Sequence, residues 1–482
     1  TFAKDAVQYH SLTAKEQKNL IHDLKKSTAF AWTVQTSDDK TITGLGFSIK
    51  PNEAFFVPIE NEKQLREFTD VFSDLAKLKI GNNVKAALLA FREHGLSVSG
   101  PLFDTMIAHY LVEPESAHDM QTITELYFGY HVMKGNEGEV ADRLCEHADY
   151  ALQLKQKLQP ELEKRGHSSL MRDVEMPLVQ VLASMEFEGD EDVLSKMSDD
   201  LKAESERVQK EIFKLAGQEF NISSPKQLGE ILFEKMKLGD KPKKTKTGQY
   251  ATGEDVLNKL AGESEIVKKI LDFREYEKLR STYVDALPKL IDKRDGRIHT
   301  DYRQAVAATG RLSSNNPNLQ NIPIRTEKGR QIRKAFIPRD KNFVFMSADY
   351  SQIELRIAKD EIMIEAFKNK RDIHTTTAAK VFKVPIEQVT PDMRRKAKEV
   401  NFGILYGSTA FGLSQNLNIS RSEAAEIISA YFEEFPAIKR YMDNAILEAR
   451  EKEYVETILG RRRYLRDINS RNITTRGFAE RN

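Results

Sequence analysis

The sequence is poor in cysteine: Cys145 is the single one among 482 residues. One cysteine excludes an internal disulfide and a zinc ribbon, and it is typical of a reducing compartment. No apolar stretch approaches the roughly 20 residues that a membrane-spanning helix needs. The first residues, TFAKDAVQYH, lack a starting methionine and a signal-peptide pattern, so we expect a fragment of a longer chain.

An excess of one charge is also missing, since the formal net charge is +1, and the overall balance therefore says nothing about partners. Residues 301–345 nevertheless carry nine Lys or Arg against three Asp or Glu, and residues 234–250 carry six Lys against two acids. Such clusters either follow a polyanion or form an ordinary solvated surface. Hydrophobic residues at 40% and charged residues at 30% predict an ordinary soluble globular protein, and the length fits roughly three domains.

The order of patterns along the chain predicts its organisation. Residues 1–158 alternate strand-like runs (AFAWTV, ITGLGFSI, AFFVPI) with helix-like ones, which is typical of an α/β domain. The chain is then strongly helical to about residue 291, with helix ends expected at Gly189 and Gly217 and a helix start at Pro225. Strands with a turn at Gly310 follow, and the last part of the chain is mostly helical again.

A carboxylate follows a short apolar run at residues 343–346, FVFM. Aromatic and β-branched residues in such a run predict a buried strand. A carboxylate just beyond it, Asp349, is unfavourable unless it is solvated, paired or bound to a metal. The sequence therefore raises the question of what partner Asp349 has.

Residues 393–408, MRRKAKEVNFGILYGS, place Arg394, Lys398, Phe402 and Tyr406 four positions apart. On a helix with 3.6 residues per turn these side chains spread over only about 120° of one face. Two cations a turn apart suit phosphates, and two rings further along suit a flat heterocycle. The pattern fits a nucleoside triphosphate lying along the helix, or else an amphipathic helix with its rings in the core and its cations solvated.

Longer motifs identify a family. Six segments carry the resemblance: DYSQIELR (349–356), RRKAKEVNFGILYG (394–407), ATGRLSSNNPNLQNIPIR (308–325), DIHTTTA (372–378), GRRRYLRDINSRN (460–472) and EMPLVQVL (175–182). The chain resembles the family A DNA polymerases, in the part that corresponds to the large, Klenow-like fragment of a bacterial DNA polymerase I. The resemblance runs through essentially the whole chain.

The resemblance implies a multidomain α/β and α+β fold. An exonuclease-like, RNase H-like α/β domain is expected at residues 1–158, a connector helix and thumb at 159–290, the first part of the palm at 291–357 and the fingers at 358–482. The implied reaction is template-directed addition of deoxynucleoside monophosphates from dNTPs to a primer 3′-hydroxyl, in DNA replication and repair. The implied partners are primer–template DNA and dNTPs without a membrane, for a monomer in the bacterial cytoplasm, at the nucleoid.

The resemblance also assigns the metal and sugar contacts. The family Asp that opens DYSQIELR binds two catalytic Mg²⁺ ions, for which Mn²⁺ is a possible substitute, and it maps onto Asp349, with the Tyr350 carbonyl as a further ligand. Hard cations of this kind prefer oxygen ligands. Gln352 is expected to contact the dNTP, and Glu354 to lie over its sugar and exclude ribonucleotides. The alternative for Glu354 is a solvated helix residue.

The remaining nucleotide contacts fall on the predicted helix and before it. By resemblance, Arg394 and Lys398 hold the β and γ phosphates, and Lys398 is the general acid toward the leaving pyrophosphate. His374 adds a phosphate contact, or is a surface histidine at a helix start. Phe402 packs on the sugar and base and offers no hydrogen bond to a 3′-hydroxyl, so poor use of dideoxynucleotides is expected. Tyr406 lies on the template side.

A further set is expected to touch DNA. Arg311 is expected to reach the minor groove at the primer terminus, where similar acceptors for every base pair allow geometry to be checked without reading sequence. The other candidates are Asn318, Gln320, Asn321, Lys243, Lys244, Arg476 and Arg481.

The front domain is predicted to be inactive as a 3′–5′ exonuclease. The family site needs four metal-binding carboxylates and a tyrosine. Thr33 and Gln35 stand at the first motif, Ala87 at the second and His147 at the third, with Arg143 at the tyrosine position. Acids lie nearby at other offsets: Asp38, Asp39, Asp104, Glu146 and Asp149. The alternative is an alignment that is wrong by a residue or two in this region.

The family's second catalytic Asp, in a VHDE motif, does not occur in this sequence, whose last residues GFAERN precede that motif in the family. The chain also looks short after residues 189 and 357. We expect that residues of a longer protein are absent from the sequence. The alternative is a truncated, non-catalytic fragment that binds primer–template DNA. A nuclease is a third hypothesis, which the missing carboxylates argue against.

Overall fold

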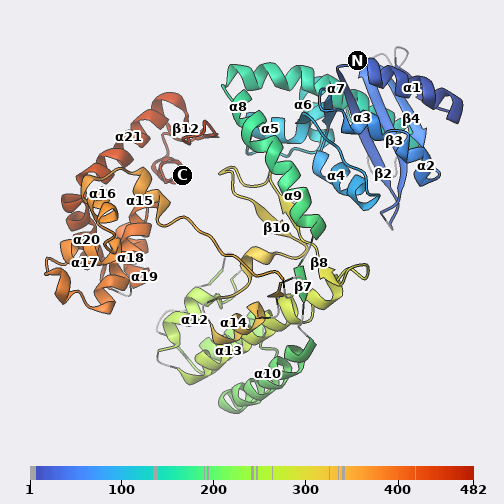
Figure 1. Ribbon diagram of the computed structural model, residues 1–482. Helices are drawn as coiled ribbons and strands as arrows, with labels where there is room; N and C mark the ends of the chain where they lie inside the picture. Colours follow the sequence, from blue (N-terminus) through green and yellow to red (C-terminus); the bar gives the residue numbers. More distant parts are fainter. Residues whose placement is uncertain are drawn as a thin grey trace. The chain divides into compact units, whose positions relative to one another are not determined.

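The computed structural model describes residues 7–38, 40–133, 139–188, 190–192, 195–239, 244–245, 248–262, 264–324, 326–334, 336–338, 342–417 and 419–481. The chain forms two compact units (Figure 1). The first comprises Thr1–Ala108, Ala117–Leu158 and Arg172–Phe345, and the second comprises His109–Ser116, Gln159–Met171 and Met346–Asn482. The four-part domain division stays a prediction.

The first unit begins with a six-stranded mixed sheet in the order β1-β4-β3-β2-β5-β6. Its strands are β1 (Gln8–Ser11), β2 (Ala29–Thr36), β3 (Ile42–Lys50), β4 (Glu53–Pro58), β5 (Leu78–Gly81) and β6 (Leu102–Asp104). The helices of this region are α1 (Ala14–Lys26), α2 (Glu62–Arg66), α3 (Thr69–Ser73), α4 (Val84–Glu93), α5 (Thr105–Val112), α6 (Met120–Phe128) and α7 (Val140–Lys164), of which the last parts of α5 and α7, from His109 and from Gln159, belong to the second unit. The predicted α/β domain is confirmed.

Aromatic side chains fill the core on one face of this sheet. Trp32 on β2 is 4.7 Å from Phe72 and 5.2 Å from Phe91 between ring centroids. Phe47 on β3 stacks on Phe68 at 5.2 Å, and all five rings are buried. Such pairs add to the stabilisation from burial alone, so β2 is held firmly in place.

The rest of the first unit is mainly helical. Its helices are α8 (Ser168–Leu170), η2 (Met171–Glu175), α9 (Met176–Glu188), α10 (Ser195–Ala216), α11 (Pro225–Gly229), η3 (Glu230–Lys235), α12 (Glu254–Leu260), α13 (Glu265–Leu279), η4 (Arg280–Val284), η5 (Leu287–Leu290), η6 (Leu319–Asn321) and α14 (Glu327–Arg333), of which α8 and Met171 belong to the second unit. Its short strands are β7 (Asp190–Asp192), β8 (Arg297–Ile298), β9 (Asp301–Arg303), β10 (Ser313–Asn315) and β11 (Phe336–Ile337).

The helix signals in this region are confirmed where the residues are described. Gly217 follows α10 with a φ of 71°, a backbone angle that glycine adopts at low cost. The Ser224 side chain accepts a hydrogen bond from the Gln227 amide, and Pro225 occupies the first turn of α11. Gly310 lies between β9 and β10 with a φ of 80°. Gly189 lies outside the described residues.

A lysine ties the sheet domain to the following segments of the first unit. Lys85 Nζ on α4 donates to Glu186 on α9, to Asp301 Oδ1 at 2.8 Å and to the Tyr302 carbonyl at 2.5 Å. The Tyr302 amide donates to the same Glu186 carboxylate at 2.6 Å. The Lys85 side chain is 13% exposed and that of Glu186 is 6% exposed, so this is a largely buried ion pair.

Replacing Lys85 by methionine is expected to destabilise the first unit by about 3 kcal/mol, because it leaves the buried Glu186 carboxylate without its cation. Thermal unfolding of Lys85→Met and of the control Lys50→Met, an exposed lysine paired with Glu53, measures the effect. Equal midpoints for the two variants would contradict the assignment. The double variant Lys85→Met/Glu186→Gln is expected to recover part of the loss.

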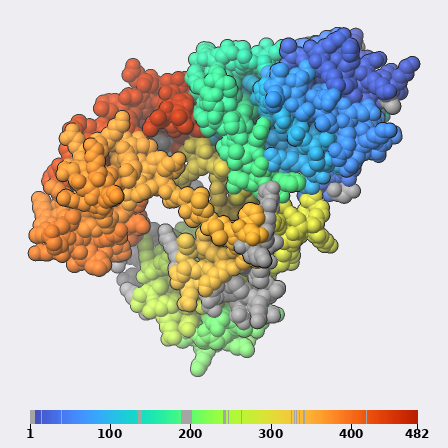
Figure 2. All heavy atoms as spheres, in the orientation of Figure 1, coloured from blue at the N-terminus to red at the C-terminus, as the bar shows by residue number. Residues whose placement is uncertain are grey.

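The predicted buried strand at residues 343–346 is wrong. These residues have no regular secondary structure, and Val344 and Met346 are 85% and 86% exposed. Figures 1 and 2 show this segment in orange, as an extended chain that leads into α15 (Ile353–Ile357). A buried strand needs neighbours that satisfy its backbone groups, and none of the described strands pairs with this segment. Composition alone therefore does not make the run a strand.

The second unit is a helical cluster. Besides α15 it contains α16 (Glu361–Lys368), α17 (Ile373–Val381), η7 (Ile386–Gln388), α18 (Pro391–Leu405), α19 (Ala410–Leu417), α20 (Arg421–Glu434), α21 (Pro436–Lys452), a hairpin of β12 (Tyr454–Glu456) and β13 (Arg462–Tyr464), and α22 (Ile473–Ala479). Its core includes Met363, Val400, Ile404, Leu413, Tyr431 and Phe435. In the described part of the chain, no helix is both long and apolar enough to span a membrane.

Candidate active site

The helix α18 presents the predicted ligand-binding face to solvent. Thr390 caps its start by accepting from the Met393 amide at 3.2 Å, and Pro391 occupies its first turn. Ala397, Val400 and Ile404 are buried on one side of the helix. Arg394, Lys398 and Tyr406 are exposed on the other side, and Phe402 is partly buried between them. The helix is confirmed, and its polar and aromatic face is open to a ligand.

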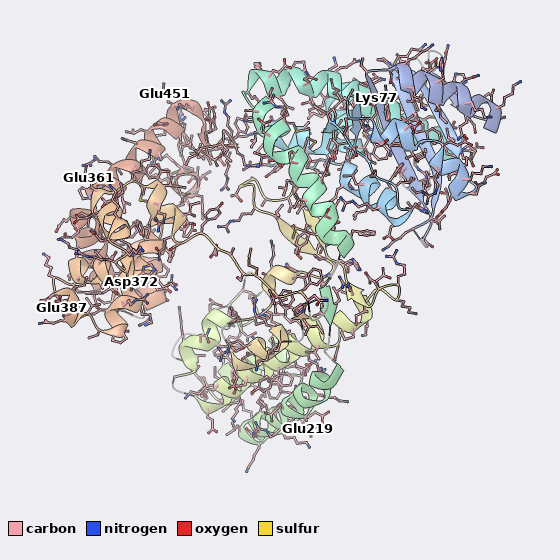
Figure 3. The ribbon with its side chains drawn as sticks, in the orientation of Figure 1. Lys77, Glu219, Glu361, Asp372, Glu387 and Glu451 are labelled. Atoms are coloured by element: carbon pink, nitrogen blue, oxygen red, sulfur yellow. The ribbon has the colours of Figure 1, made fainter. Side chains whose placement is uncertain are left out.

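The first cation on this face, Arg394, is held by an aspartate at the start of α17. Asp372, labelled in Figure 3, caps α17 by accepting from the His374 amide at 3.1 Å and the Thr375 hydroxyl at 2.7 Å. The Arg394 guanidinium donates to the same carboxylate. Partial burial raises the pKa of Asp372, but these hydrogen bonds outweigh it and the pKa is lowered. Asp372 therefore stays ionised and orients Arg394.

Lys398, the second cation on this face, has no such carboxylate partner in the described part of the chain. Among the described residues, no carboxylate lies within salt-bridge distance of Lys398 Nζ. Lys398 is exposed one turn beyond Arg394 on the same helix face. One oriented guanidinium and one unpaired ammonium on adjacent turns are well suited to a chain of phosphates.

A buried polar network positions the histidine beside this face. His374 is 4% exposed, and its Nδ1 accepts from Asn401 Nδ2 at 3.1 Å. The Thr377 hydroxyl bonds the same amide at 3.2 Å. The His374 ring lies 5.7 Å from the Phe402 ring, so the network joins α17 to α18. Burial lowers the pKa of His374, and the charges of Arg394 and Lys398 act in the same direction against that of Asp372.

Protonation of His374 is expected to destabilise the second unit, because a proton on Nδ1 would face the Asn401 N–H donor. The folded pKa lies below the ordinary value near 6.5, so the unfolded chain binds more protons between the two values. The free energy of unfolding should therefore fall as pH drops below about 6.5. Urea unfolding across this range should show a flatter pH dependence for His374→Gln, whose amide oxygen still accepts. Equal slopes would contradict this role.

The far end of α18 meets the segment that carries the motif DYSQIELR. The Tyr406 hydroxyl donates to Glu354 Oε1 on α15 at 2.7 Å. Gln352 precedes α15 with a left-handed backbone, at φ 50° and ψ 52°. Gly407 follows α18 with a φ of 72°, and a Cβ there would stand 3.3 Å from Arg481 Cγ. Glu354, Tyr406 and Arg481 are thus brought to the same end of the helix.

Asp349 and Tyr350 lie in the exposed extended segment before α15. Carboxylate and carbonyl oxygens are the donors that suit Mg²⁺, which is commonly held by one or two carboxylates plus substrate phosphates. Asp349 has no cationic side chain as a salt-bridge partner within the described ranges, so it is free to act as one such ligand. No group of three or more His, Cys, Asp or Glu side chains that could hold a metal occurs among these residues.

The predicted DNA-contact residues are polar and accessible. Arg311, Asn318, Gln320 and Asn321 are exposed in the first unit, on either side of β10 and at η6. Asn318 Oδ1 accepts from the Gln320 amide at 3.1 Å, and Gln320 Nε2 donates to the Leu312 carbonyl at 3.1 Å, which fixes this loop.

Two further groups of candidates lie elsewhere. Lys244 is exposed with its Nζ 4.8 Å from the Tyr250 ring centroid, whereas Lys243 lies outside the described residues. Arg476 on α22 donates to the Ser470 carbonyl at 3.3 Å, and Arg481 lies over the Phe478 ring at 4.6 Å.

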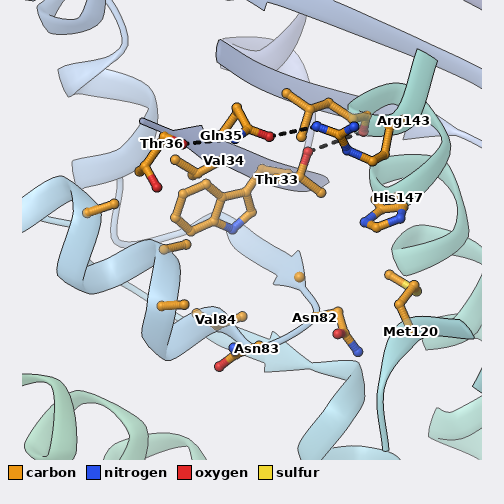
Figure 4. A pocket seen from close by; sticks show the side chains of 16 residues that line it. Thr33, Val34, Gln35, Thr36, Asn82, Asn83, Val84, Met120, Arg143 and His147 are labelled. Carbon is orange, nitrogen blue, oxygen red and sulfur yellow. Dashed lines mark hydrogen bonds between the residues drawn. The ribbon is translucent and has the colours of Figure 1, made fainter. Parts of the chain in front are cut away.

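The positions that the motif offsets assign to the exonuclease carboxylates and tyrosine converge on one cavity. Thr33, Gln35, Ala87, Arg143 and His147 all line a cavity of about 500 Å³ in the first unit (Figure 4). They come from β2, α4 and α7, which are far apart in the sequence. None of the residues that line this cavity is Asp or Glu.

The nearby acids are absent from the lining and bond other groups. Glu146 accepts from the Tyr130 hydroxyl and the Met133 amide at 2.6 and 2.7 Å. Asp104 accepts from the Asn83 and Val84 amides at 3.0 and 2.7 Å, and so caps α4. Burial raises the pKa of Asp104 to about 6 against these hydrogen bonds.

Asp149 is also committed: it accepts from the Asn52 amide and Gln153 Nε2, each at 2.9 Å. Asp38 is absent from the cavity lining, and Asp39 lies outside the described residues.

The sequence did not single out Asn401, Thr377 or Asp372. A signal for Asn401 existed, because it is a polar residue on the buried side of an amphipathic helix and such a residue needs a hydrogen-bond partner. Asp372 stands directly before IHTTTA, as helix N-caps often do.

Comparisons with known proteins agree along the chain. The family model "DNA polymerase family A" matches residues 191–482, and the model "DNA polymerase I, ribonuclease H-like domain" matches residues 32–138. The DNA polymerase I of Geobacillus stearothermophilus is 45% identical over 449 residues, which cover 89% of this chain and 51% of that protein. The DNA polymerase I of Bacillus subtilis is 44% identical over 459 residues, 91% of this chain and 52% of that protein. The chain thus spans about half the length of these relatives.

A solved structure matches the whole fold. The POL domain of Pol1 from M. smegmatis, in a complex with DNA primer-template and dNTP, superimposes with a TM-score of 0.89. The match covers 98% of this chain and 84% of that chain, at 32% sequence identity.

Proposed function

The chain belongs to DNA polymerase family A, and we propose that it extends a primer 3′-hydroxyl with deoxynucleoside monophosphates under the direction of a template. The observation that carries the proposal is the open face of α18, where Arg394, Lys398, Phe402 and Tyr406 follow one another. The complex of the M. smegmatis POL domain with primer-template and dNTP supports these two ligands.

In the proposed reaction the cations of α18 bind the triphosphate of the incoming nucleotide. Arg394, oriented by Asp372, acts as a fork on the terminal phosphates. The primer 3′-oxygen loses its proton to solvent and bonds to the α-phosphorus as the bond from this phosphorus to the pyrophosphate breaks. Lys398 contacts the same phosphates and gives a proton to the leaving pyrophosphate oxygen. His374, fixed by Asn401, adds a contact on the same side.

The sugar and base are proposed to lie along the rest of the face. Phe402, whose ring centroid lies 5.7 Å from that of His374, packs against the sugar and base. Glu354, held by the Tyr406 hydroxyl, stands over the sugar, where a carboxylate disfavours a 2′-hydroxyl. Tyr406 faces the template side.

Family A polymerases use divalent metal ions, and we propose that Asp349 and the Tyr350 carbonyl hold two Mg²⁺ ions, together with substrate phosphates and further ligands outside the described residues. When bound, the ions lower the pKa of the primer hydroxyl and neutralise charge on the phosphates.

Primer–template DNA is proposed to bind through the exposed polar groups. Arg311 and the polar residues that follow it contact the minor groove, and Lys244 contacts backbone phosphates without regard to sequence. Arg476 and Arg481 are proposed to contact the template.

The test is template-specific incorporation. The natural protein that carries this sequence is given four primer–templates that differ in the first unpaired base, each with one dNTP at a time. The proposal requires that the complementary nucleotide is added in every case. Addition that ignores the template, or DNA binding without addition, would contradict it, and the latter outcome would favour a non-catalytic DNA-binding fragment.

We further propose that the front domain has no 3′–5′ exonuclease activity. The absence of carboxylates from the lining of the cavity at Thr33, Gln35 and His147 supports this proposal. A 5′-labelled single strand incubated with Mg²⁺ or Mn²⁺ is expected to keep its full length. Shortening that EDTA stops would show that carboxylates elsewhere form a nuclease site.

A further inference from the structure

The cavity that replaces the exonuclease site has the features of a binding site. It has a volume of about 500 Å³, within the range of pockets that hold small molecules. One part of its lining is apolar, with Val34, Ala90, Met120 and Leu144. The other part is polar (Figure 4), and includes Thr33, Gln35, Asn82, Asn83, Arg143 and His147.

Arg143 brings a buried positive charge to this lining. Its side chain on α7 is 7% exposed, and it has no carboxylate partner among the described residues. Its Nη2 donates to Gln35 Oε1 at 2.9 Å, which is the dashed line between these two residues in Figure 4. An amide oxygen accepts one N–H but does not neutralise the charge. Burying a cation without an anion is unfavourable, so an anion bound beside Arg143 would be stabilised there.

Trp32 adds a donor without a partner. It lines the cavity and is 2% exposed, and its Nε1 has no hydrogen-bond partner in the described part of the protein. The Nε1 atom lies 3.9 Å from where a Cβ on Gly81 would stand, and Gly81 also lines the cavity. Buried N–H groups are nearly always bonded, so Nε1 is an unused donor in the packing beside Gly81.

Two other polar groups of the lining already use their donors within the protein. Thr33 donates its hydroxyl hydrogen to the Leu144 carbonyl at 3.2 Å. His147 Nε2 bonds the Met133 carbonyl at 2.9 Å, which holds the ring in place. The features that favour negative charge over a metal ion are therefore the Arg143 guanidinium, which has no carboxylate partner among the described residues, and a lining without carboxylates.

We propose that this cavity binds a small oxyanion, a phosphate or carboxylate group on a compact and partly apolar molecule, without a divalent metal. The oxyanion lies against the Arg143 guanidinium, and the apolar body contacts the Met120 and Leu144 side. Oxyanion binding in this cavity is separate from the polymerase reaction, so the protein can have either one without the other.

Trp32 is the single tryptophan of the chain, so its fluorescence reports directly on this cavity. The protein in EDTA is titrated with inorganic phosphate and, separately, with benzoate, and sodium chloride at matched ionic strength serves as a blank. A saturable change in emission is expected with at least one oxyanion and not with chloride. Arg143→Met should weaken the binding by about tenfold or more, as for the loss of a hydrogen bond to a charged group.

Arg66→Met is the matched control, because it removes an exposed arginine of the same unit that pairs with Glu62, and it should bind as the wild type does. Ala87→Glu places a carboxylate within the same lining and should also weaken oxyanion binding. This variant provides the test if Arg143→Met does not fold. No saturable change, or equal affinity in all three variants, would overturn the proposal. Tighter binding of a single-stranded oligonucleotide than of either small anion would overturn the assignment to a small ligand.

Discussion

Replacing Lys398 with methionine is expected to lower the rate of nucleotide incorporation by a factor of about 10² to 10⁴, the range for loss of a general acid. Lys398 is exposed on α18 and no carboxylate among the described residues pairs with it, so its substitution should not disturb the fold. Methionine keeps most of the length of the side chain and removes both the charge and the transferable proton. Primer–template affinity should therefore change little.

The two cations of α18 are expected to differ in kinetics. Arg394→Met should act mainly on KM for the nucleotide, since Arg394 is proposed to bind phosphates in the ground state and the transition state alike. Lys398→Met should act mainly on kcat. The control is Arg395→Met, because Arg395 is paired with Asp392 and is not on the ligand face. Single-turnover incorporation across dNTP concentrations measures both constants.

If Arg395→Met lowered kcat as much as Lys398→Met does, the loss of any positive charge on α18 would have the same effect. Lys398 would then have no specific role in the reaction. A Lys398→Met enzyme with unchanged kcat would remove Lys398 from the proton transfer.

Replacing Asp349 with alanine is expected to lower primer extension on the order of a thousandfold or more. A metal ion at the phosphoryl group supplies several kcal/mol of transition-state stabilisation, and each 1.36 kcal/mol is a factor of ten. Duplex binding should stay largely intact, because Asp349 is exposed on an extended segment. Extension assays and a binding titration of the same preparation separate the two effects.

Glu361→Gln is the control for this change, since Glu361 (Figure 3) is an acidic residue in the first turn of α16 in the same unit. It should extend primers at the wild-type rate. Extension by Asp349→Ala at a rate close to that of this control would mean that the metal assignment is wrong.

Local patterns predicted the helices well, because caps and apolar spacing act over a few residues. Ser224 and Pro225 begin α11 and Gly217 ends α10 as their residue types suggest. The four-residue spacing from Arg394 also predicted the helix α18, which has Val400 and Ile404 in the core, and the binding of a nucleotide to its exposed face stays a prediction.

What depends on distant neighbours was not predictable from the sequence. The run FVFM has strand composition, yet Val344 and Met346 are exposed, because a strand also needs partners that the run itself does not specify. The bond from Tyr406 to Glu354 spans 52 positions, and no local pattern indicates it. The roles of the site residues stay predictions until they are measured.

The arrangement of the exonuclease positions was predictable from the sequence only in part. Motif offsets identified Thr33, Ala87 and His147 separately, and the structure brings all three to one cavity. The sequence could say that the carboxylates are absent. It could not say that, among the described residues, buried Arg143 has no anionic partner and Trp32 Nε1 has no hydrogen-bond partner, because both depend on which residues distant in the sequence pack around them.

One gel tests the central claim most directly: a labelled primer on a longer template, with Mg²⁺, with and without the four deoxynucleotides, incubated with the natural protein that carries this sequence. The account predicts that the primer grows to the end of the template when nucleotides are present and keeps its length when they are absent. A primer that does not grow with nucleotides would contradict the polymerase assignment. A primer that shortens without them would contradict the inactive front domain.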